Sequence, residues 1–547
     1  MATASAITAE SPEPDGFTAL AADSRTVAIW TLVSRITGVG RVIAVAAVLG
    51  PTYFGNLFQT LNTLPNIIHV MLVGQLITAL LVPALVKHLD LRDGAGAARL
   101  AGGFLGAILL VGSVVVALCL LGQSFLLSVI TAAVADPQIR ADQLRIGWFL
   151  LMLLLPQIFL YGIAAAAAAV QQAHRRFALP AAAPALENIG TIAVMGAAAW
   201  LYGTGHDVGG VTTPQLLLIG FGATAAVAIH AVMQWWGAYR LGVVLLPRAG
   251  WRNPEVQQII RLAIPSCGYA ALNTLTLFGF LVVAGGIPGG AVAFQIGYNF
   301  FSLPGAVGAQ PAAAAMLPRL SRAFHQDNDM AMRTIYRDSL ALASFVAFPA
   351  GLLFLFLCGP LAPIVSFGEM ATSAGLLLVA ASIGGMGLAV LGEAAILILT
   401  SAAYACRDAI SPFRATALRT AISLAGMAVA MLALDGTAVI WTLGLSFSAA
   451  SFVAAAYLYI RLARLRSQQP REWRHSLLGN LTAAAVAVLP GWLVAYALGN
   501  AGGSSISGAL VGLAAVGASG VTYLLIQWWR GSREFTALFA VAGRLGK

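Results

Sequence analysis

The chain has 547 residues, of which 59% are hydrophobic and only 9% are charged. Soluble domains carry roughly 25% charged residues, so this composition excludes a soluble protein and a disordered chain. The formal net charge of +10 would suggest nucleic-acid binding in a soluble protein. In a membrane protein the same excess is typical of cytoplasmic loops, so we expect no nucleic-acid partner. The composition therefore predicts an all-α polytopic membrane protein.

The first 25 residues are polar and partly acidic, and they lack the basic and apolar regions of a signal peptide. We predict a disordered cytoplasmic tail over residues 1–25. The rest of the chain contains fourteen apolar windows, each long enough for a transmembrane helix of about 20 residues. The windows are too long for transmembrane β-strands. They cover residues 27–49, 53–86, 98–122, 144–172, 179–203, 213–240, 259–285, 288–318, 336–358, 371–404, 412–434, 437–460, 477–499 and 505–529.

Basic residues are concentrated in every second loop between these windows. Arg175 and Arg176, for example, follow the fourth window, whereas the loops on the other side hold little more than Arg140 and Arg145. Cytoplasmic loops are enriched in Lys and Arg. The alternation therefore predicts an even number of spans, with both termini on the cytoplasmic side of a bacterial inner membrane.

Two motifs each occur twice, and in both cases the second copy lies somewhat less than half the chain length after the first. Residues 173–180 and 405–412 each begin with alanine, pass through a basic turn and end in proline. A Leu-Pro motif occurs at residues 64–65 and again at residues 303–304, with a nearly equal separation. An even number of spans per repeat predicts two parallel lobes of six helices that face each other across a central cavity. The competing interpretation is chance similarity between alanine-rich helices. The predicted units are the N-lobe (26–242), the C-lobe (243–465), and two additional helices with a cytoplasmic tail (466–547).

Arg35 and Arg41 lie in the first window, where a charged residue is costly and is therefore a functional candidate. Six residues of helix separate them by about 9 Å along the axis and about 120° around it, so both can face one cavity. Guanidinium groups bind phosphate oxygens in pairs, which predicts a phosphate-binding role. Gly38 and Gly40 leave room beside them for an anion or for a close helix. Alternatively, Arg35 extends to the cytoplasmic interface.

The carboxylates deep in the windows are Glu187 and Glu393, and we predict that they couple transport to protons or pair with arginine. Glu187 precedes Asn188 and can instead join two helices. His69 follows Pro65, where a kink would open towards the cavity. His230 is predicted to be a packing residue.

Asn299 lies near Pro304 and is expected to line the opposite wall. The kink or hinge positions are Pro65, Pro304, Gly38 and Gly40. No motif for catalysis or metal binding occurs, so we expect a transporter without a metal site or cofactor, driven by the membrane potential or an ion gradient.

Several motifs, in this order, resemble those of the MurJ (MviN) family of lipid II flippases, part of the multidrug/oligosaccharidyl-lipid/polysaccharide (MOP) exporter superfamily. They are Ser34-Arg35-x-x-Gly38-x-x-Arg41, Leu64-Pro65-Asn66 with Val82-Pro83, Arg176-Phe177-x-x-Pro180 with Pro184 and Asn188, Leu303-Pro304 through Leu317-Pro318, and Tyr404 to Pro412. The resemblance covers nearly the whole chain. It implies two six-helix lobes with two extra C-terminal helices, and cavity arginines that hold the pyrophosphate of a lipid-linked sugar.

The chain departs from the family pattern at several polar positions. His69 lies in a stretch that carries a basic pair and an acidic residue in the family, Asn299 replaces an arginine, and Asn56 replaces an aspartate. The windows at 259–285, 412–434 and 437–460 lack the aspartates of a sodium site. The substrate implied is lipid II or another lipid-linked glycan.

Two alternatives remain, namely a cation-coupled multidrug or polysaccharide exporter of the same superfamily and a transport-inactive scaffold in cell-wall assembly. The expected partners are membrane lipids and cell-wall synthesis proteins, and the expected state is a monomer.

Overall fold

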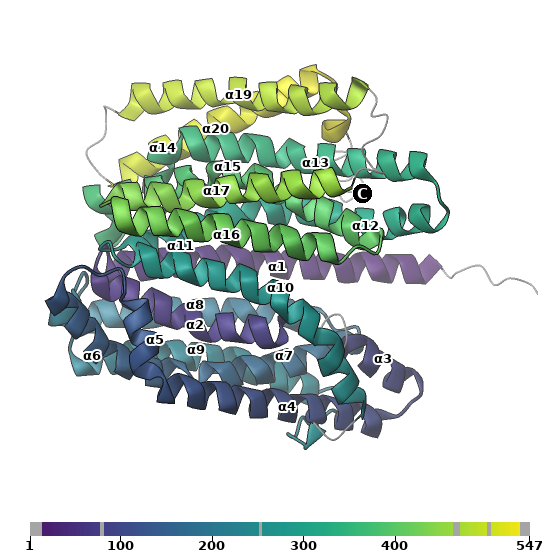
Figure 1. Cartoon of the computed structure of the whole chain (residues 1–547), viewed down its shortest axis with the longest axis horizontal. Coiled ribbons are helices and arrows are strands. Elements are labelled where there is room, and N and C mark those ends of the chain that lie inside the picture. Colours follow the sequence, from purple (N-terminus) through teal and green to yellow (C-terminus); the bar gives the residue numbers. More distant parts are fainter. Residues whose placement is uncertain (1–13, 77–80, 251–253, 463–470, 500–504, 537–547) are drawn as a thin grey trace, which may run out of the picture.

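The structure is a computed structural model that describes residues 14–76, 81–250, 254–462, 471–499 and 505–536. Each predicted window coincides with one helix or with consecutive helices (Figure 1). The N-lobe contains α1 (Pro14–Leu49), α2 (Tyr53–Leu76), α3 (Val82–Asp90), α4 (Gly94–Leu121), α5 (Gln123–Ile130), α6 (Pro137–Leu154), α7 (Gln157–Ala173), α8 (Ala178–Tyr202), the short 3-10 helix η2 (Val208–Gly210) and α9 (Thr213–Tyr239).

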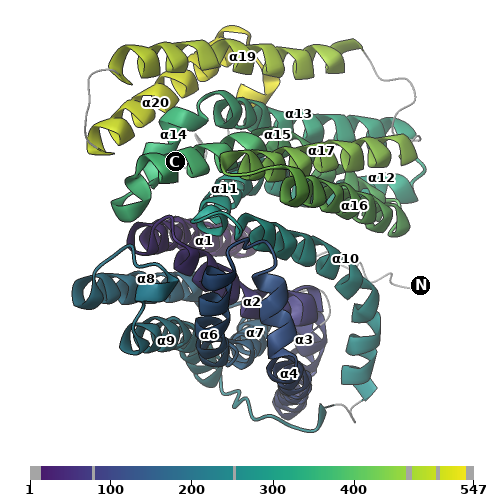
Figure 2. The ribbon, with the colours of Figure 1, turned by 60° about the vertical axis from the view of Figure 1, so that its left-hand side comes forward.

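The C-lobe and the C-terminal pair complete the described chain. They comprise α10 (Pro254–Ala284), α11 (Gly290–Pro304), the π-helical turn η4 (Gly305–Ala309), α12 (Gln310–His325), α13 (Asp329–Phe356), α14 (Cys358–Val365), the 3-10 turn η5 (Gly368–Ala371), α15 (Ser373–Ala405), α16 (Ile410–Ala433) and α17 (Thr437–Arg461), followed by α19 (Arg471–Gly499) and α20 (Ser505–Trp529). The two lobes lie side by side, and α19 and α20 cover the outer face of the C-lobe (Figure 2).

Within the described residues, twelve helical segments are long and apolar enough to cross a membrane. The predicted total of fourteen spans is therefore not confirmed. The two windows outside this set correspond to α2, which is rich in Asn, Gln and Thr, and to α10, of which Ala270–Ala284 is a shorter apolar segment within the described residues. Both helices border the space between the lobes, where polar side chains avoid contact with lipid.

Two predicted boundaries differ from the structure. The prediction of a disordered tail over residues 1–25 is wrong for residues 14–25, which form the start of α1; residues 1–13 lie outside the described part. Proline is tolerated in the first helical turn and acidic residues are favourable there, as with Pro14 and Asp15. Residues 243–250, assigned to the C-lobe, pack on α4 of the N-lobe. The backbone of Arg248 lies so close to Gly106 that a Cβ there would be 1.9 Å from the Arg248 carbonyl oxygen.

The predicted repeat is visible in the helix packing. In the N-lobe α8 packs between α1 and α9, and α7 packs on α9; in the C-lobe α16 packs between α10 and α17, and α15 packs on α17. The turns repeat as well. Among the described residues, the non-glycine residues with positive φ form two related pairs, Arg92 with Asp327 and Arg175 with Arg407. Each of the four ends a helix in a left-handed turn that satisfies the last carbonyl groups, so the repeat extends to backbone detail.

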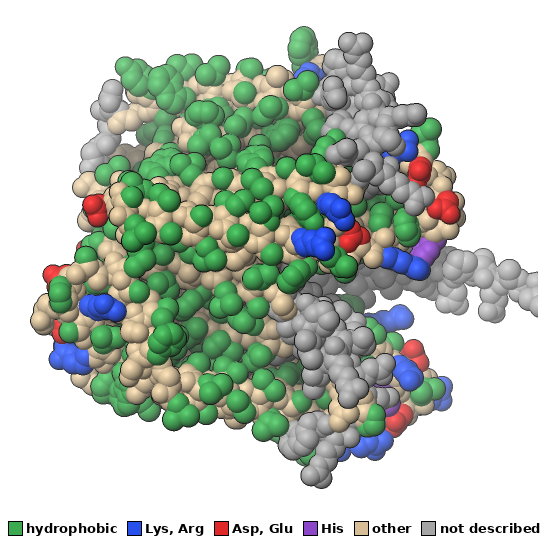
Figure 3. Space-filling model, viewed as in Figure 1, with side chains coloured by type: hydrophobic (Ala, Val, Ile, Leu, Met, Phe, Trp, Pro, Cys, Tyr) green, Lys and Arg blue, Asp and Glu red, His purple; other side chains and the backbone are tan. Residues whose placement is uncertain are grey.

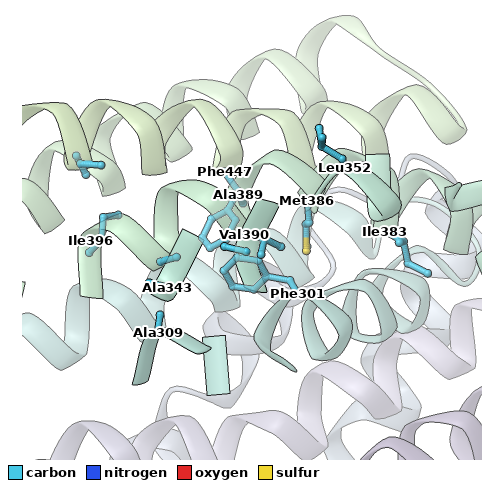
Figure 4. Close-up of a cluster of buried hydrophobic side chains, with 14 of the residues drawn as sticks. Phe301, Ala309, Ala343, Leu352, Ile383, Met386, Ala389, Val390, Ile396 and Phe447 are labelled. Atoms are coloured by element: carbon cyan, nitrogen blue, oxygen red, sulfur yellow. The ribbon is translucent and has the colours of Figure 1, made fainter. Parts of the chain in front are cut away.

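Small residues allow close packing in the C-lobe core. α15 and α17 approach so closely that a Cβ at Gly385 would lie 3.1 Å from the Cα atom of Gly444. Phe301, Met386 and Phe447 fill the adjoining space (Figure 4). Without a hydrophobic driving force between helices in lipid, such close packing supplies much of the association energy.

Charged side chains gather at the two ends of the helix bundle, and a broad apolar belt lies between them (Figure 3). One end, called the basic end below, carries the turns α3–α4, α7–α8, α12–α13 and α15–α16, and each of these turns contains or adjoins arginines. The other end, called the opposite end, carries the α1–α2 and α10–α11 turns. This distribution is the one expected of a multi-pass membrane protein.

A buried polar chain attaches α19 and α20 to α13. The Asn480 amide donates to the Ser344 hydroxyl (3.2 Å), the Gln527 amide donates to the Asn480 oxygen (2.9 Å), and the Tyr523 hydroxyl donates to the Phe345 carbonyl (2.8 Å). Asn480 and Gln527 are fully buried. Buried polar groups require hydrogen-bond partners, so each of these contacts stabilises the attachment of α19 and α20 to α13.

Replacement of Asn480 by Ala should lower the free energy of unfolding by about 1 kcal/mol, because it leaves the buried Gln527 amide without its acceptor. Thermal unfolding of the purified protein in detergent measures the effect. Thr482→Ala, at an exposed position on the same helix, is the control and should leave the melting temperature unchanged. Equal melting temperatures for all three proteins would contradict the structural role of this polar chain.

Candidate functional site

A polar cavity of about 1120 Å³, partly open to the outside, lies between the two lobes. Its walls come from α1, α2 and α7 of the N-lobe and from α10 and α11 of the C-lobe, which meet at the junction of the lobes (Figure 2). The polar residues that line it are Arg41, Gln59, Asn62, Thr63, Asn66, Tyr161, Asn273, Thr274, Gln295, Tyr298 and Asn299. Among these described lining residues, Arg41 is the one with a charged side chain. We call this space the central cavity.

Arg41 is held at the cavity wall by Glu187 of α8. The Arg41 guanidinium lies 3.4 Å from the carboxylate of Glu187, which also accepts a hydrogen bond from the Tyr161 hydroxyl (2.9 Å) and lies 3.0 Å from the His230 ring. Glu187 is buried, whereas about a third of the Arg41 side chain remains exposed. Arg41 thus keeps N–H groups available towards the cavity while Glu187 compensates its charge.

The structure shows what Glu187, Asn188 and His230 contact. Of the two roles considered for Glu187, pairing with arginine is observed. Asn188 joins α8 to α1 by donating to the Ser34 carbonyl and the Thr37 hydroxyl, both at 3.2 Å. His230, expected to be a packing residue, is instead a polar partner of Glu187. Spacing along the chain offers no sign of this contact, since α9 follows α8 but the pairing depends on how the two helices cross.

Arg35 does not share the central cavity with Arg41. Its side chain is exposed, and it is not among the residues that line the cavity. Gly38 and Gly40, considered as space for an anion or for a helix, face α8: a Cβ at these positions would lie 3.5 Å from Asn188 and 3.6 Å from Ile192. The helix therefore occupies the room that the glycines leave.

The remaining predicted residues lie on α2 and α11. His69 stacks against Tyr161, with the ring centres 5.5 Å apart, so it lies behind a lining residue rather than at the wall. Asn299 lines the cavity from the C-lobe and donates to the Gln295 carbonyl at 2.9 Å. Pro65 is buried within a continuous α2, and Pro304 is followed by the π-helical turn η4. Such turns interrupt a helix at a defined place, as expected of a kink.

A second cavity of about 630 Å³, called the C-lobe cavity, adjoins the central cavity and shares Asn273, Leu277 and Tyr298 with it. Glu393 of α15 lines it and forms an ion pair with Arg419 of α16 at 2.8 Å.

Arg419 is not among the residues predicted from the sequence, although the repeat contains a signal for it. Arg407 follows Arg175 at a fixed offset between the related turns. The same offset leads from Glu187 to Arg419, and it also leads from Tyr161 to Glu393. A charged residue at such a position in the N-lobe therefore indicates that the residue at the same offset in the C-lobe is a candidate for a functional charge.

The lobes are joined at the opposite end of the molecule. The Asn56 amide donates to the carbonyls of Gly285 (3.1 Å) and Ile287 (2.6 Å), and its oxygen accepts from the backbone N–H of Ala291 (3.0 Å). The Thr204 hydroxyl donates to Glu369 at 2.6 Å. These contacts, called the interlobe contacts below, lie beyond the central cavity, at the opposite end.

The comparison with known families decides the assignment. The family model described as "Lipid II flippase MurJ" matches residues 45–506. The chain belongs to the lipid II flippase MurJ family. A probable lipid II flippase MurJ of Rhizobium tropici is 22% identical over 467 residues, which cover 85% of this chain and 84% of the relative. The lipid II flippase MurJ of Burkholderia cenocepacia is 23% identical over 402 residues, covering 71% of this chain and 74% of the relative.

Solved structures show the same fold at low sequence identity. An inward closed conformation of a lipid II flippase MurJ aligns with a TM-score of 0.73 at 14% identity, covering 92% of this chain and 99% of that chain. An inward-facing MATE family transporter of the MOP superfamily aligns with a TM-score of 0.63 at 14% identity, covering 80% and 96%. For an outward-facing MATE transporter the TM-score is 0.51, at 15% identity and coverages of 82% and 97%. The resemblance to the MurJ family predicted from the motifs is thus confirmed, and these transporters of the MOP superfamily share the fold.

The Arg41–Glu187 pair yields a prediction for stability. Glu187→Gln should lower the free energy of unfolding by about 1–3 kcal/mol, because the Arg41 charge loses its counter-ion and the histidine its partner. The double variant Arg41→Gln/Glu187→Gln should lose less than the sum of the two single variants, since neither charge is then left alone. Thermal unfolding in detergent provides the double-mutant cycle. Additive losses would show that the two side chains do not interact.

Proposed function

We propose that this protein is an alternating-access flippase, which moves a polyprenyl-(pyro)phosphate-linked cell-wall precursor of the lipid II type from the cytoplasmic to the outer leaflet. The observation that carries the proposal is the central cavity, a polar space between repeat-related lobes with Arg41 at its wall. Side-chain hydrogen bonds of Asn56 and Thr204 join the lobes beyond this cavity, at the opposite end. Membership of the lipid II flippase family supports the choice of substrate.

The proposed cycle follows from the arrangement of charges. The basic end is assigned to the cytoplasm together with both termini, because basic loops face that side. The headgroup enters the central cavity while the isoprenyl tail stays in lipid. Arg41 binds a phosphate oxygen with the N–H groups that Glu187 leaves available, and the neutral amides of Asn62, Asn66 and Asn299 contact the rest of the headgroup. Charge-assisted bonds to phosphate are the strongest of these interactions.

Release on the outer side requires the interlobe contacts to break and the basic end to close. Asn56 contributes three of the hydrogen bonds that must open, all of them to backbone groups of the α10–α11 turn. The lobes then rock about the central cavity, as repeats of this kind do. Glu187 and Glu393 are the candidates for coupling this motion to the membrane potential or to an ion gradient. We propose no cofactor, and a monomer as the working unit.

Replacement of Arg41 by Ala should reduce transport at least tenfold, because it removes the charged group of the cavity wall, while Arg41→Lys should retain part of the activity. The measurement is the loss of headgroup accessibility when a lipid-linked precursor is flipped in vesicles that contain the purified protein. Arg414→Ala, an exposed arginine on α16, is the matched control. Unchanged flipping by the Arg41→Ala variant would refute the role of this residue.

Complementation distinguishes the substrates. Rescue of a bacterial strain depleted of its own lipid II flippase supports lipid II as the cargo. Failure of a well-expressed protein to rescue, together with flipping of another lipid-linked glycan in vesicles, would assign a different precursor. Failure in both assays would leave the cation-coupled exporter and the transport-inactive scaffold as explanations and would refute the flippase proposal.

The interlobe contacts provide a test of alternating access. In a variant without the native cysteines, Thr204→Cys/Glu369→Cys joined by a short thiol-specific cross-linker should lose transport, because the lobes can no longer separate at the opposite end. Cleavage of the cross-linker should restore transport. The control pair Asp142→Cys/Arg145→Cys lies within α6 and should transport equally with and without the cross-linker. Transport by the cross-linked protein would contradict the proposed opening.

A further inference from the structure

Two ion pairs of the described helix bundle, Arg41–Glu187 and Arg419–Glu393, each have one member at a related position of the repeat, and these two members carry opposite charges. At the offset of the repeat, Glu187 on α8 corresponds to Arg419 on α16, and Tyr161 on α7 corresponds to Glu393 on α15. In the N-lobe the acid at this position is compensated by Arg41; in the C-lobe the arginine is compensated by Glu393. Each lobe therefore presents one guanidinium group to a cavity, and each guanidinium has a carboxylate as its counter-ion.

The surroundings of Arg419 are those of a binding site rather than of a sealed structural ion pair. Its guanidinium carbon lies 4.5 Å from the centre of the Phe447 ring, which holds the side chain in place from α17. Asn273 and Thr276 from α10 border the same cavity. Arg419 is largely buried, yet it borders the C-lobe cavity, which adjoins the central cavity. Close packing would normally fill such space around a pair that serves only stability.

The groups that face Glu393 are few. Arg419 comes from α16 and Tyr298 from α11, and these are the titratable side chains that the described C-lobe cavity places against it. α10 contributes Asn273 and Thr276, and α17 contributes the apolar ring of Phe447. Arg419 is therefore the charged partner of Glu393 in this cavity.

We infer that the C-lobe cavity is a second oxyanion-binding site, in which a phosphate oxygen replaces the Glu393 carboxylate on Arg419 while Glu393 takes up a proton. The step is balanced: Glu393 changes from carboxylate to carboxylic acid with one proton from water, and Arg419 keeps its charge and exchanges one anionic partner for another. The ligand class is a phosphate or pyrophosphate group. Its role in transport rests on the proposed function, whereas binding itself does not.

Electrostatics within the bundle makes the proton part of the binding event. The Arg419–Glu393 pair is neutral, so an added anion would leave uncompensated negative charge in a region of low dielectric constant. A proton on Glu393 removes one such charge. Because one proton enters with the anion, the apparent affinity should rise by up to about tenfold for each unit by which the pH falls. Anion movement through this site is thereby linked to proton movement.

The test uses the full-length protein in detergent and isothermal titration calorimetry. Inorganic sulfate is the first probe, because its charge is constant between pH 6 and pH 8.5 and every proton taken up must then bind to the protein. Titrations in two buffers of different ionisation enthalpy count the protons. Inorganic pyrophosphate and a polyprenyl pyrophosphate in micelles are the second and third probes, and they separate a free phosphate from a lipid headgroup as the natural source. The wild-type protein should take up about one proton per anion bound at this site.

Glu393→Gln should bind sulfate about tenfold more tightly than the wild type at pH 8 and should lose the pH dependence, because its amide neither titrates nor compensates Arg419. The double variant Glu393→Gln/Arg419→Gln removes both charges and avoids an unpaired buried carboxylate. It should lose binding at this site together with proton uptake, while melting cooperatively. Arg414→Gln, on the exposed side of the same helix, should bind as the wild type does.

Affinity that is independent of pH in the wild type, or equal affinities for the wild type and Glu393→Gln, would overturn the inference. The proposed function can fail separately. Proton-linked anion binding without flipping in vesicles would support the second site and refute the flippase. Flipping without proton-linked binding would support the flippase and refute the second site.

Discussion

The need to compensate charge inside an apolar slab governs this structure. Among the described side chains, four charges within the bundle form two pairs, Arg41 with Glu187 and Arg419 with Glu393, and each pair borders a cavity. An isolated guanidinium would be costly at this depth. Because each counter-ion is a carboxylate on a neighbouring helix, an incoming anion competes with a group that is already present. In the proposed function, binding is thus an exchange of ionic partners on the arginine.

The repeat places Glu187 and Arg419, one member of each pair, at related positions, although their charges are opposite. The left-handed turns at Arg175 and Arg407 show that even strained backbone positions follow the repeat. The side chains that they position have diverged, since a tyrosine and a glutamate in one lobe correspond to a glutamate and an arginine in the other. The backbone therefore fixes where a polar group can stand, and the sequence of each lobe decides which charge it carries.

The helices and the repeat could be predicted because apolar length and loop charge are local properties of a sequence. Arg41 and Glu187 could be selected for the same reason, as charges within apolar windows. Their contact, and the role of His230, depend on how α1, α8 and α9 cross, which no local pattern records. The prediction that Arg35 lines the cavity used only the helical spacing within α1 and not the packing of α8 against that helix. Arg419 was not predicted, because it lies close in sequence to a basic loop. Asn299 and His69 were both predicted to lie at the cavity. Asn299 lines the central cavity, whereas His69 is not among its lining residues.

The C-terminal helices have a mechanical consequence. α19 and α20 pack on α13 and α14, and the polar chain through Asn480 and Ser344 fixes them there. They are thus attached to the C-lobe and extend away from the junction between the lobes. A molecule that binds this hairpin, or a lipid layer that resists its tilting, would apply its force to the C-lobe alone. In the proposed alternating-access cycle, the surroundings could therefore act on one of the two lobes through the hairpin.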